Sequence, residues 1–472
     1  MKLLKNFTVA LLLLMVGISG FSCDHLAIDP EQSISNDAFF ESMADFRSGI
    51  GGGYNQMQGA SWYGRTMPLV PDLMSEDVKQ SAQANRYQEF ADYEGLRQSG
   101  HQYERDLWRE VYETINILNN MINAEEGFEP PSTSVTELNQ LIGEAYALRA
   151  LAYFDLVRMY AQHYTFSAGA SHPGVPIVTT FDVTSLPSRN TVSEVYTQII
   201  ADFNVAIGKM TMDRGFSQFS KEAAQALLSR VYLYMEDFTN SIAMADAVIN
   251  SGRYSLVSAG SYLTMFSDGG SSEAILEVSN SPTDNIGSDS VGGMYRKSGY
   301  GDYLPALDLL NLIDLNDIRL GMFIFDPDLT GPYASMRVNK YPTTTNTDNV
   351  PVIRLSEVYL NRAEAYARSG NDAGAQADLN LIRQRGLSTA PDVTLTGDAL
   401  LADILMERRI ELANEGHRIF DITRHKMDVV RVDFTGDVGL ITYGSPLSNF
   451  WIFPMPAQEV DVNPNIEQNP GY

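Results

Sequence analysis

The sequence predicts a mainly α-helical protein, built from pairs of helices interrupted by large irregular insertions that carry short β-hairpins. Apolar residues recur at steps of three and four in several long segments, which is the spacing of one helix face. On these faces small alanines alternate with large Tyr, Leu and Phe, as in tetratricopeptide-type helix pairs. With 44% hydrophobic residues, 24 Tyr and 21 Phe, the chain has enough apolar surface for a large packed core.

The helical pattern is strongest at 144–160, where Ala145, Leu148, Ala152 and Leu156 fall on one face. The same spacing predicts further helices at 107–122, 223–234, 242–249 and 355–368.

The helix expected at 355–368 stops at Gly370, because glycine readily adopts the left-handed conformation that ends helices. Asn371 or Asp372 is expected to cap the next helix, which carries Ala375 and Leu379. The helix pairs do not recur at the roughly 34-residue period of a regular repeat array. We therefore expect a helical scaffold with insertions.

Two insertions are predicted, at 49–103 and 253–350, and insertions of this kind often carry function. The first is rich in Gly and aromatic residues, and its glycine run at 49–53 is interpreted as a flexible loop. The second is rich in Gly, Ser, Thr, Asn and Asp. Short β-like stretches are expected at 274–278 and 450–453.

The N-terminus predicts export. Lys2 and Lys5 precede a short apolar run at 10–18, and small residues then lead to Cys23, the only cysteine of the chain. This order predicts a signal peptide over residues 1–22 and lipid attachment at Cys23, as at a bacterial lipobox. An ordinary cleaved signal with an incidental Cys23 is the alternative. The acyl chain is the only membrane contact that we expect, because no later stretch reaches the roughly 20 apolar residues of a membrane helix.

The formal net charge of −26 argues against nucleic acid as a partner, because phosphates would be repelled. Sequence signatures of phosphate loops, zinc helices and nucleophile elbows are absent, and no catalytic residue, cofactor or metal is predicted. His417 and His425, eight residues apart, fit hydrogen-bonded histidines better than a metal pair. Glu407, Glu411 and Glu415 recur every four residues beside arginines, which favours ion pairs over catalysis.

Motifs along the whole chain resemble those of SusD/RagB-type lipoproteins of Bacteroidetes. They lie at Cys23 to Pro30, Phe39-Phe40, Asp45-Phe46, Glu144 to Phe154, Gly174 to Val178, Ser188 to Val192, Arg354 to Ala365, Glu407 to Leu412 with Glu415 to Arg418 and Asp421, Phe453 to Pro456, and Gln468 to Tyr472.

The resemblance implies a SusD-like scaffold in one intertwined body, with an N-terminal region at 23–230 and a C-terminal region at 270–472. It also implies a nutrient-binding protein of the outer membrane, facing the cell exterior, and not an enzyme. Its expected partner is a SusC-like TonB-dependent transporter, on which the protein acts as a lid. The expected ligand is an oligosaccharide, although some branches of the family bind peptides.

Aromatic rings and polar groups complement the apolar faces and hydroxyl edges of sugars, so we expect the two insertions to meet in a ligand site. Its predicted residues are Trp62, Tyr63, Asp77, Arg86, Tyr87, Tyr295 and Tyr300. Trp62 is expected to be exposed because Ser61 and Gly64 flank it in a polar loop. In the alternative interpretation, these rings only pack the loops onto the body.

Two further functions compete with glycan binding. A glycoside hydrolase on a helical scaffold would need two carboxylates at a fixed separation, and the sequence singles out no such pair. A helical-repeat scaffold that binds only other proteins would retain no carbohydrate.

Overall fold

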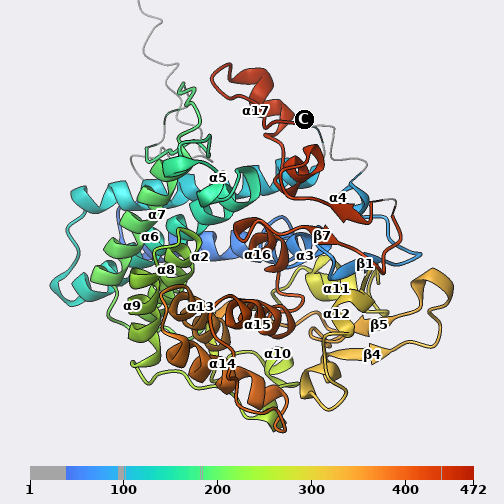
Figure 1. The fold of residues 1–472 in the computed structure, drawn as a ribbon. Helices are drawn as coiled ribbons and strands as arrows, with labels where there is room; N and C mark the ends of the chain where they lie inside the picture. The colour runs from blue at the N-terminus through green and yellow to red at the C-terminus, as the bar shows by residue number, and fades with distance from the viewer. Residues whose placement is uncertain (1–38, 94–99, 101, 181, 183, 437) are drawn as a thin grey trace, which may run out of the picture.

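Helices make up most of the protein, as predicted (Figure 1). The computed structural model describes residues 39–93, 100, 102–180, 182, 184–436 and 438–472. The expected signal peptide at 1–22 and the lipidation site Cys23 lie outside these residues. Among the helices of the described residues, none is both long and apolar enough to cross a membrane.

The longer helices of the first half are α2 (Met43–Gln58), α5 (Gln102–Ala124), α6 (Val135–Tyr160), α7 (Val192–Lys209), α8 (Lys221–Tyr234) and α9 (Phe238–Ile249). Those of the second half are α13 (Leu355–Arg368), α14 (Asp372–Gly386) and α15 (Gly397–Glu411). Shorter helices are α3 (Thr66–Leu73), α4 (Gln88–Asp92), α10 (Met265–Asp268), α11 (Val291–Tyr295), α12 (Leu307–Leu310), α16 (Arg418–Arg424) and α17 (Ala457–Val462).

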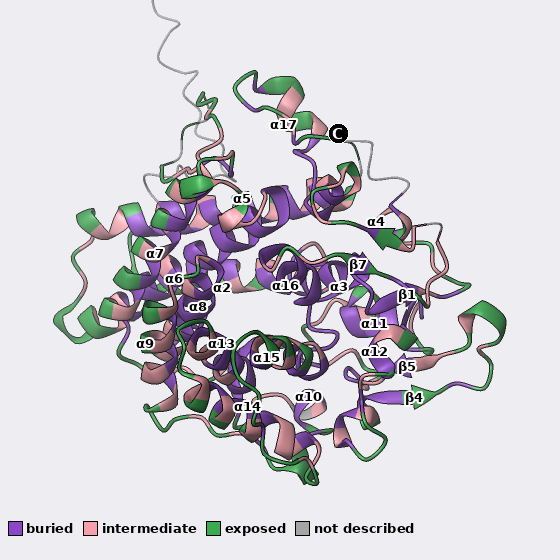
Figure 2. Ribbon diagram, in the orientation of Figure 1, coloured by how far each residue is buried: buried purple, intermediate pink, exposed green. Residues whose placement is uncertain are grey.

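Helix α6 is the centre of the N-terminal half and is packed by α5 and α7. Its alanines, among them Ala145, Ala147 and Ala152, have no exposed surface, so the neighbouring helices approach its backbone closely. Figure 2 shows the same burial in the other inner helices, α3, α8 and α16.

Two pairs of consecutive helices pack against each other: α8 packs against α9, and α13 packs against α14. The predicted cap of α14 is confirmed, since the side chain of Asn371 accepts a hydrogen bond from the Gly374 amide at 3.1 Å. Gly370 has φ +80°, as expected of the residue that ends a helix. A tetratricopeptide-like geometry of these pairs stays a prediction.

The glycine run at 49–53 is helical, so the prediction of a flexible loop there is wrong. All four glycines belong to α2, and two of them, Gly49 and Gly53, permit close packing against neighbouring side chains. A Cβ atom at Gly53 would lie 2.8 Å from Leu148 Cδ2, and one at Gly49 would lie 2.8 Å from Phe40 Cε1. Close packing against neighbours outweighs the low intrinsic helix propensity of glycine at these positions.

The strands form two-stranded antiparallel ladders. The strands are β1 (Val78–Gln80), β2 (Ala274–Val278), β3 (Tyr303–Pro305), β4 (Phe323–Phe325), β5 (Met336–Val338), β6 (Val350–Arg354), β7 (Val429–Val430) and β8 (Leu440–Ile441). They pair as β1 with β3, β2 with β6, β4 with β5, and β7 with β8. The strand expected at 274–278 is confirmed as β2. The strand expected at 450–453 is wrong, because Pro446–Trp451 is a 3-10 helix.

A buried network of ion pairs joins the second insertion to the C-terminal helices. Glu411 on α15 lies 2.6 Å from Arg354 and 2.5 Å from Arg385, and Glu415 lies 2.8 Å from Arg354. Glu407 lies 2.6 Å from Arg319. The ion-pair role predicted for these three glutamates is confirmed.

Candidate functional site

The candidate site is formed where the β1–β3 ladder brings the two insertions side by side. Val78 pairs with Pro305 and Gln80 with Tyr303, so the chain after β1 runs next to the chain before β3. Ser81 continues this contact, since its amide donates to the Asp302 carbonyl at 2.8 Å and its hydroxyl to the Gly301 carbonyl at 2.7 Å. Two loops distant in sequence are thereby held together beside β1 (Figure 1).

The central contact of the site is between Arg86 and Tyr300. The Arg86 guanidinium carbon lies 3.5 Å from the centroid of the Tyr300 ring, and both side chains are partly exposed. Arg86 is oriented by Asp302, whose Oδ2 lies 3.1 Å from Nη1. Burial raises the pKa of Asp302, which the Arg86 charge opposes. The guanidinium covers one face of the Tyr300 ring, and the pair, called the platform, presents an aromatic ring and N–H donors side by side.

A cleft of about 470 Å³ lies on the neighbouring β4–β5 hairpin. Phe325 on its wall is 76% exposed, which is unusual for a large aromatic side chain. Arg337 links this cleft to the platform, because it bonds Asp326 Oδ2 at 2.7 Å and the Gly301 carbonyl at 3.4 Å. The bond from Arg337, helped by Lys297, lowers the pKa of Asp326 to about 2.

The structure places five of the seven predicted ligand residues in the core. Trp62 is fully buried and donates to Asp155, and Tyr63 lies beside it. Tyr87 stacks on Tyr103, Asp77 pairs with Arg409 at 2.6 Å, and Tyr295 is bonded by Asn414. The expectation that Trp62 is exposed is wrong, because the polar turn around it folds onto α6. Arg86 and Tyr300 remain accessible.

Sequence reasoning did not select Phe325, Lys297, Arg337 or Asp302. Phe325 closes the short apolar run Phe323-Ile324-Phe325 inside a polar insertion, and this run was the available signal. No sequence pattern distinguishes Lys297, Arg337 and Asp302, because isolated charged residues are common in loops.

The two candidate metal-binding histidines have separate acidic neighbours. His417 Nε2 lies 3.9 Å from Glu357 and His425 Nε2 lies 2.9 Å from Glu364. Burial lowers the pKa of His417 to about 3 against the charge of Glu357, so this histidine is neutral in the core.

Comparisons with known proteins place the chain in a family. Residues 329–472 match the model of the SusD family, and residues 28–233 match a model described as starch-binding associating with outer membrane. A SusD-like protein of Formosa agariphila is 26% identical over the full length of both chains.

Two crystal structures have the same fold at higher identity. A protein from Bacteroides vulgatus, described as a candidate sugar binding protein, is 30% identical with a TM-score of 0.84, covering 92% of this chain and 99% of that one. A SusD superfamily protein from Bacteroides thetaiotaomicron is 30% identical with a TM-score of 0.83, covering 91% and 100%. Where these descriptions name an activity, it is binding and not catalysis, in agreement with the sequence. The chain belongs to the SusD family of Bacteroidetes proteins.

Proposed function

We propose that this protein is a glycan-binding lipoprotein of the cell surface that delivers oligosaccharides to a SusC-like TonB-dependent transporter. The observation that carries the proposal is the platform of Arg86 stacked on Tyr300. An aromatic ring takes the apolar C–H face of a sugar, while guanidinium N–H groups donate to its hydroxyls. Phe325 offers a second exposed ring on the adjacent hairpin.

The charges at the platform favour neutral sugars. Arg86 is paired with Asp302, Arg337 with Asp326, and Lys297 with both Asp326 and Asp328. Each cation is thus balanced by a carboxylate, and the whole chain has a net charge of −26. Uronate or sulfated glycans would gain no free cation here and would be repelled by the body.

The comparisons support a sugar ligand. The Bacteroides vulgatus neighbour carries a sugar-binding description at 30% identity. The starch-binding protein SusD of Bacteroides thetaiotaomicron is 32% identical over 133 residues, which are 28% of this chain. A laminarin-binding SusD-like protein has a TM-score of 0.73 at 24% identity, which is a likeness of fold.

Titration calorimetry with maltohexaose and laminarihexaose tests the platform. We expect Tyr300→Ala to weaken binding of the preferred glycan at least about tenfold, or about 1.4 kcal/mol. Tyr300→Phe keeps the ring and should bind nearly as the wild type does.

Phe238→Ala is the matched control, because Phe238 is another half-buried ring, with the Arg368 guanidinium carbon 5.0 Å from its centroid. Equal affinities of wild type and Tyr300→Ala, with unchanged melting temperatures, would remove the platform from the proposal.

The lid role requires a broad contact with the transporter, above the roughly 1,200 Å² of weak encounters. Mild detergent extraction and pull-down should recover a TonB-dependent barrel, and its repeated absence would contradict this role. Protease treatment of intact cells should degrade the protein if it faces the exterior.

A peptide-binding member of the family and a helical-repeat interaction scaffold are the alternatives. A peptide binder would bind oligopeptides and ignore both glucans. A scaffold would co-purify with a membrane partner while retaining no carbohydrate.

A further inference from the structure

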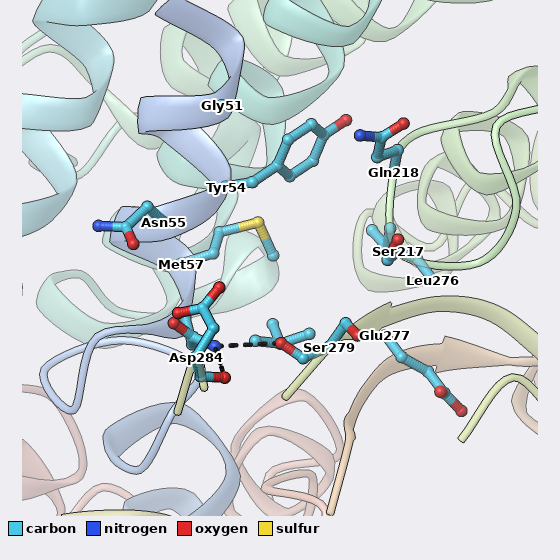
Figure 3. A pocket seen from close by; sticks show the side chains of 12 residues that line it. Gly51, Tyr54, Asn55, Met57, Ser217, Gln218, Leu276, Glu277, Ser279 and Asp284 are labelled. Atoms are coloured by element: carbon cyan, nitrogen blue, oxygen red, sulfur yellow. Dashed lines mark hydrogen bonds between the residues drawn. The ribbon is translucent and has the colours of Figure 1, made fainter. Parts of the chain in front are cut away.

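A second cleft, of about 310 Å³, lies between α2 and β2 and shares no lining residue with the platform or the cleft beside Phe325. Its walls come from α2, from the loop before α8, and from the segment that runs from β2 to Asp284. The lining residues are Gly51, Tyr54, Asn55, Met57, Gln58, Ser217, Gln218, Leu276, Glu277, Val278, Ser279 and Asp284. Figure 3 shows Tyr54, Met57, Ser217, Gln218 and Asp284 around its opening.

The shape of this cleft is held by hydrogen bonds behind its walls. The Gln58 amide donates to the carbonyls of Ser279 and Asp284, each at 3.1 Å. These bonds attach the wall formed by the segment from β2 to Asp284 to helix α2. The hydroxyl of Tyr54 donates to Glu144 at 2.8 Å and accepts from the Phe219 amide at 2.8 Å. Because these hydrogen bonds already hold the walls in place, little conformational entropy is lost when a ligand binds.

Several polar groups on the walls are free to bind a ligand. Within the described residues, the Asp284 carboxylate and the hydroxyls of Ser217 and Ser279 have no hydrogen-bond or ion-pair partner. Gln218 accepts a bond from Arg214 through Oε1, and its Nε2 donors are unused. The free groups therefore include one carboxylate, two hydroxyls and the amide donors of Gln218.

The charge of the cleft excludes anionic ligands. No Lys or Arg lines it, while Asp284 adds a negative charge at the rim. The Glu277 carboxylate is directed away from the opening, where it accepts bonds from the Gly270 amide and from Asn349, both at 2.9 Å (Figure 3). Burial raises the pKa of Glu277.

We propose that this cleft is a second saccharide site, which binds a neutral hydroxyl-rich ligand of about one or two sugar rings. The Tyr54 ring and Met57 give apolar contact to the C–H face. Asp284 and Ser279 accept from sugar hydroxyls, and Gln218 donates to them. A carboxylate acceptor gives the stronger bonds, as in other charge-assisted pairs. The volume is near the lower end of the roughly 300–1,000 Å³ of ligand pockets. It limits the part of a ligand held inside the cleft to this size, and further sugar rings of a longer chain would extend out of the opening.

Two glycines of α2 provide a matched pair of variants. A Cβ atom at Gly51 or at Gly52 meets nothing within 4 Å, so each position accepts a Cβ atom without a clash. Only Gly51 lines the cleft. Gly51→Leu places a side chain at the opening, while Gly52→Leu makes the same change in helix propensity beside it.

Hydrogen–deuterium exchange with mass spectrometry reads the two sites separately, with maltotriose and laminaritriose as probes. In the wild type we expect a trisaccharide to slow exchange at 81–87 on the platform and at 214–219 and 276–284 around the cleft. Tyr300→Ala should lose only the platform protection. Gly51→Leu should lose only the cleft protection, and Gly52→Leu should behave as the wild type.

Two further measurements test the chemistry of the cleft. Asp284→Asn and Gln218→Ala should each raise the ligand concentration needed for half-maximal protection of the cleft about fivefold. Tri-galacturonic acid should give no protection at 276–284, because its carboxylates meet Asp284.

Cleft protection that survives Gly51→Leu, or that no neutral trisaccharide produces in folded wild-type protein, would overturn the second site. Protection by a short peptide in place of the sugars would also overturn it. Protection of the cleft without protection at 81–87 would support the second site and remove the platform from the proposed function, so the two sites fail separately.

Discussion

The indole Nε1 of Trp62 donates a hydrogen bond to Asp155 Oδ2 at 2.7 Å, with both side chains excluded from solvent. Asp155 also binds the guanidinium of Arg158, three residues along α6. The turn that carries Trp62 is thereby attached to the central helix of the N-terminal half. A tryptophan in this position supports the core.

Trp62→Ala should therefore lower stability and leave glycan affinity nearly unchanged. Removing a fully buried tryptophan costs about 3–5 kcal/mol, and it leaves Asp155 with one fewer donor. Urea denaturation measures the loss, and calorimetry on the folded fraction measures the affinity. A melting temperature equal to that of the wild type, combined with tenfold weaker binding, would show that Trp62 contributes to ligand binding and not to the core.

Glu411 holds three arginines, and its removal should be among the most destabilising single changes. Burial alone would raise the pKa of Glu411, but Arg385, Arg354 and Arg319 hold it well below its usual range. Glu411→Gln leaves these guanidinium groups without their shared anion, which should cost about 3–5 kcal/mol in urea denaturation.

Glu137→Gln is the surface control for that experiment. Glu137 pairs with Arg47 at 2.6 Å, but the two side chains are 28% and 52% exposed. Water and salt screen such a pair, so the change should cost no more than about 1 kcal/mol. Equal losses in the two variants would show that the buried network contributes no more than an exposed pair.

His163 should make the protein less stable in mild acid. Its ring nitrogens contact the hydroxyls of Tyr443 and Thr165 at 2.9 and 3.1 Å, and neither partner is charged. Burial, with the charges of Lys426 and His172, lowers the pKa of His163 from 6.5 to about 3. Because the folded pKa lies below the unfolded one, the stability that His163 contributes is full above pH 6.5 and declines as the pH falls toward 3.

His163→Gln removes this titration. Between pH 7 and pH 5 the wild type should lose up to about 2 kcal/mol more than the variant, from about 1.4 kcal/mol per pH unit below 6.5. Urea midpoints across this range measure the difference. Parallel stability curves for the two proteins would show that folding does not lower the pKa of His163.

Cys23→Ala tests the predicted anchor. The variant should leave the membrane fraction and take up no fatty-acid probe, because it lacks the thiol to which the acyl chain is expected to be attached. Cys23→Ser controls for the loss of the thiol alone and should behave in the same way. Retention of either variant in the membrane, with normal probe labelling, would contradict lipid attachment at Cys23.

Local sequence patterns predicted several helices and the cap of α14, but they missed α2 and α7. The pattern at 355–368 gave the bounds of α13, and Asn371 caps the helix that follows. These features depend on neighbours within four residues, which a single sequence contains. The ion pairs of Glu407, Glu411 and Glu415 were also predicted, although their partners, Arg319, Arg354 and Arg385, were not.

The ligand site was predicted less well, because exposure depends on contacts between distant segments. Ser61 and Gly64 around Trp62 suggested a solvent-facing loop. In the structure the indole is buried and donates a hydrogen bond to Asp155, which is 93 residues away in the sequence. The glycines at 49–53 suggested a loop, and packing against Phe40 and Leu148 made them a helix. Phe325 and its neighbour Ile324 are 76% and 47% exposed, because the end of β4 is not covered by other elements.

The sequence by itself determined the helical class, the positions of several main helices, the family motifs and the expected export signal. These follow from periodicity, capping residues and local motifs, which act over short distances along the chain. Only the tertiary structure decided which aromatic rings are buried and which form a surface. Arg86 and Tyr300 are 214 residues apart in sequence, and the β1–β3 ladder between the two insertions brings them to 3.5 Å. Such a contact depends on long-range pairing, which no local pattern records.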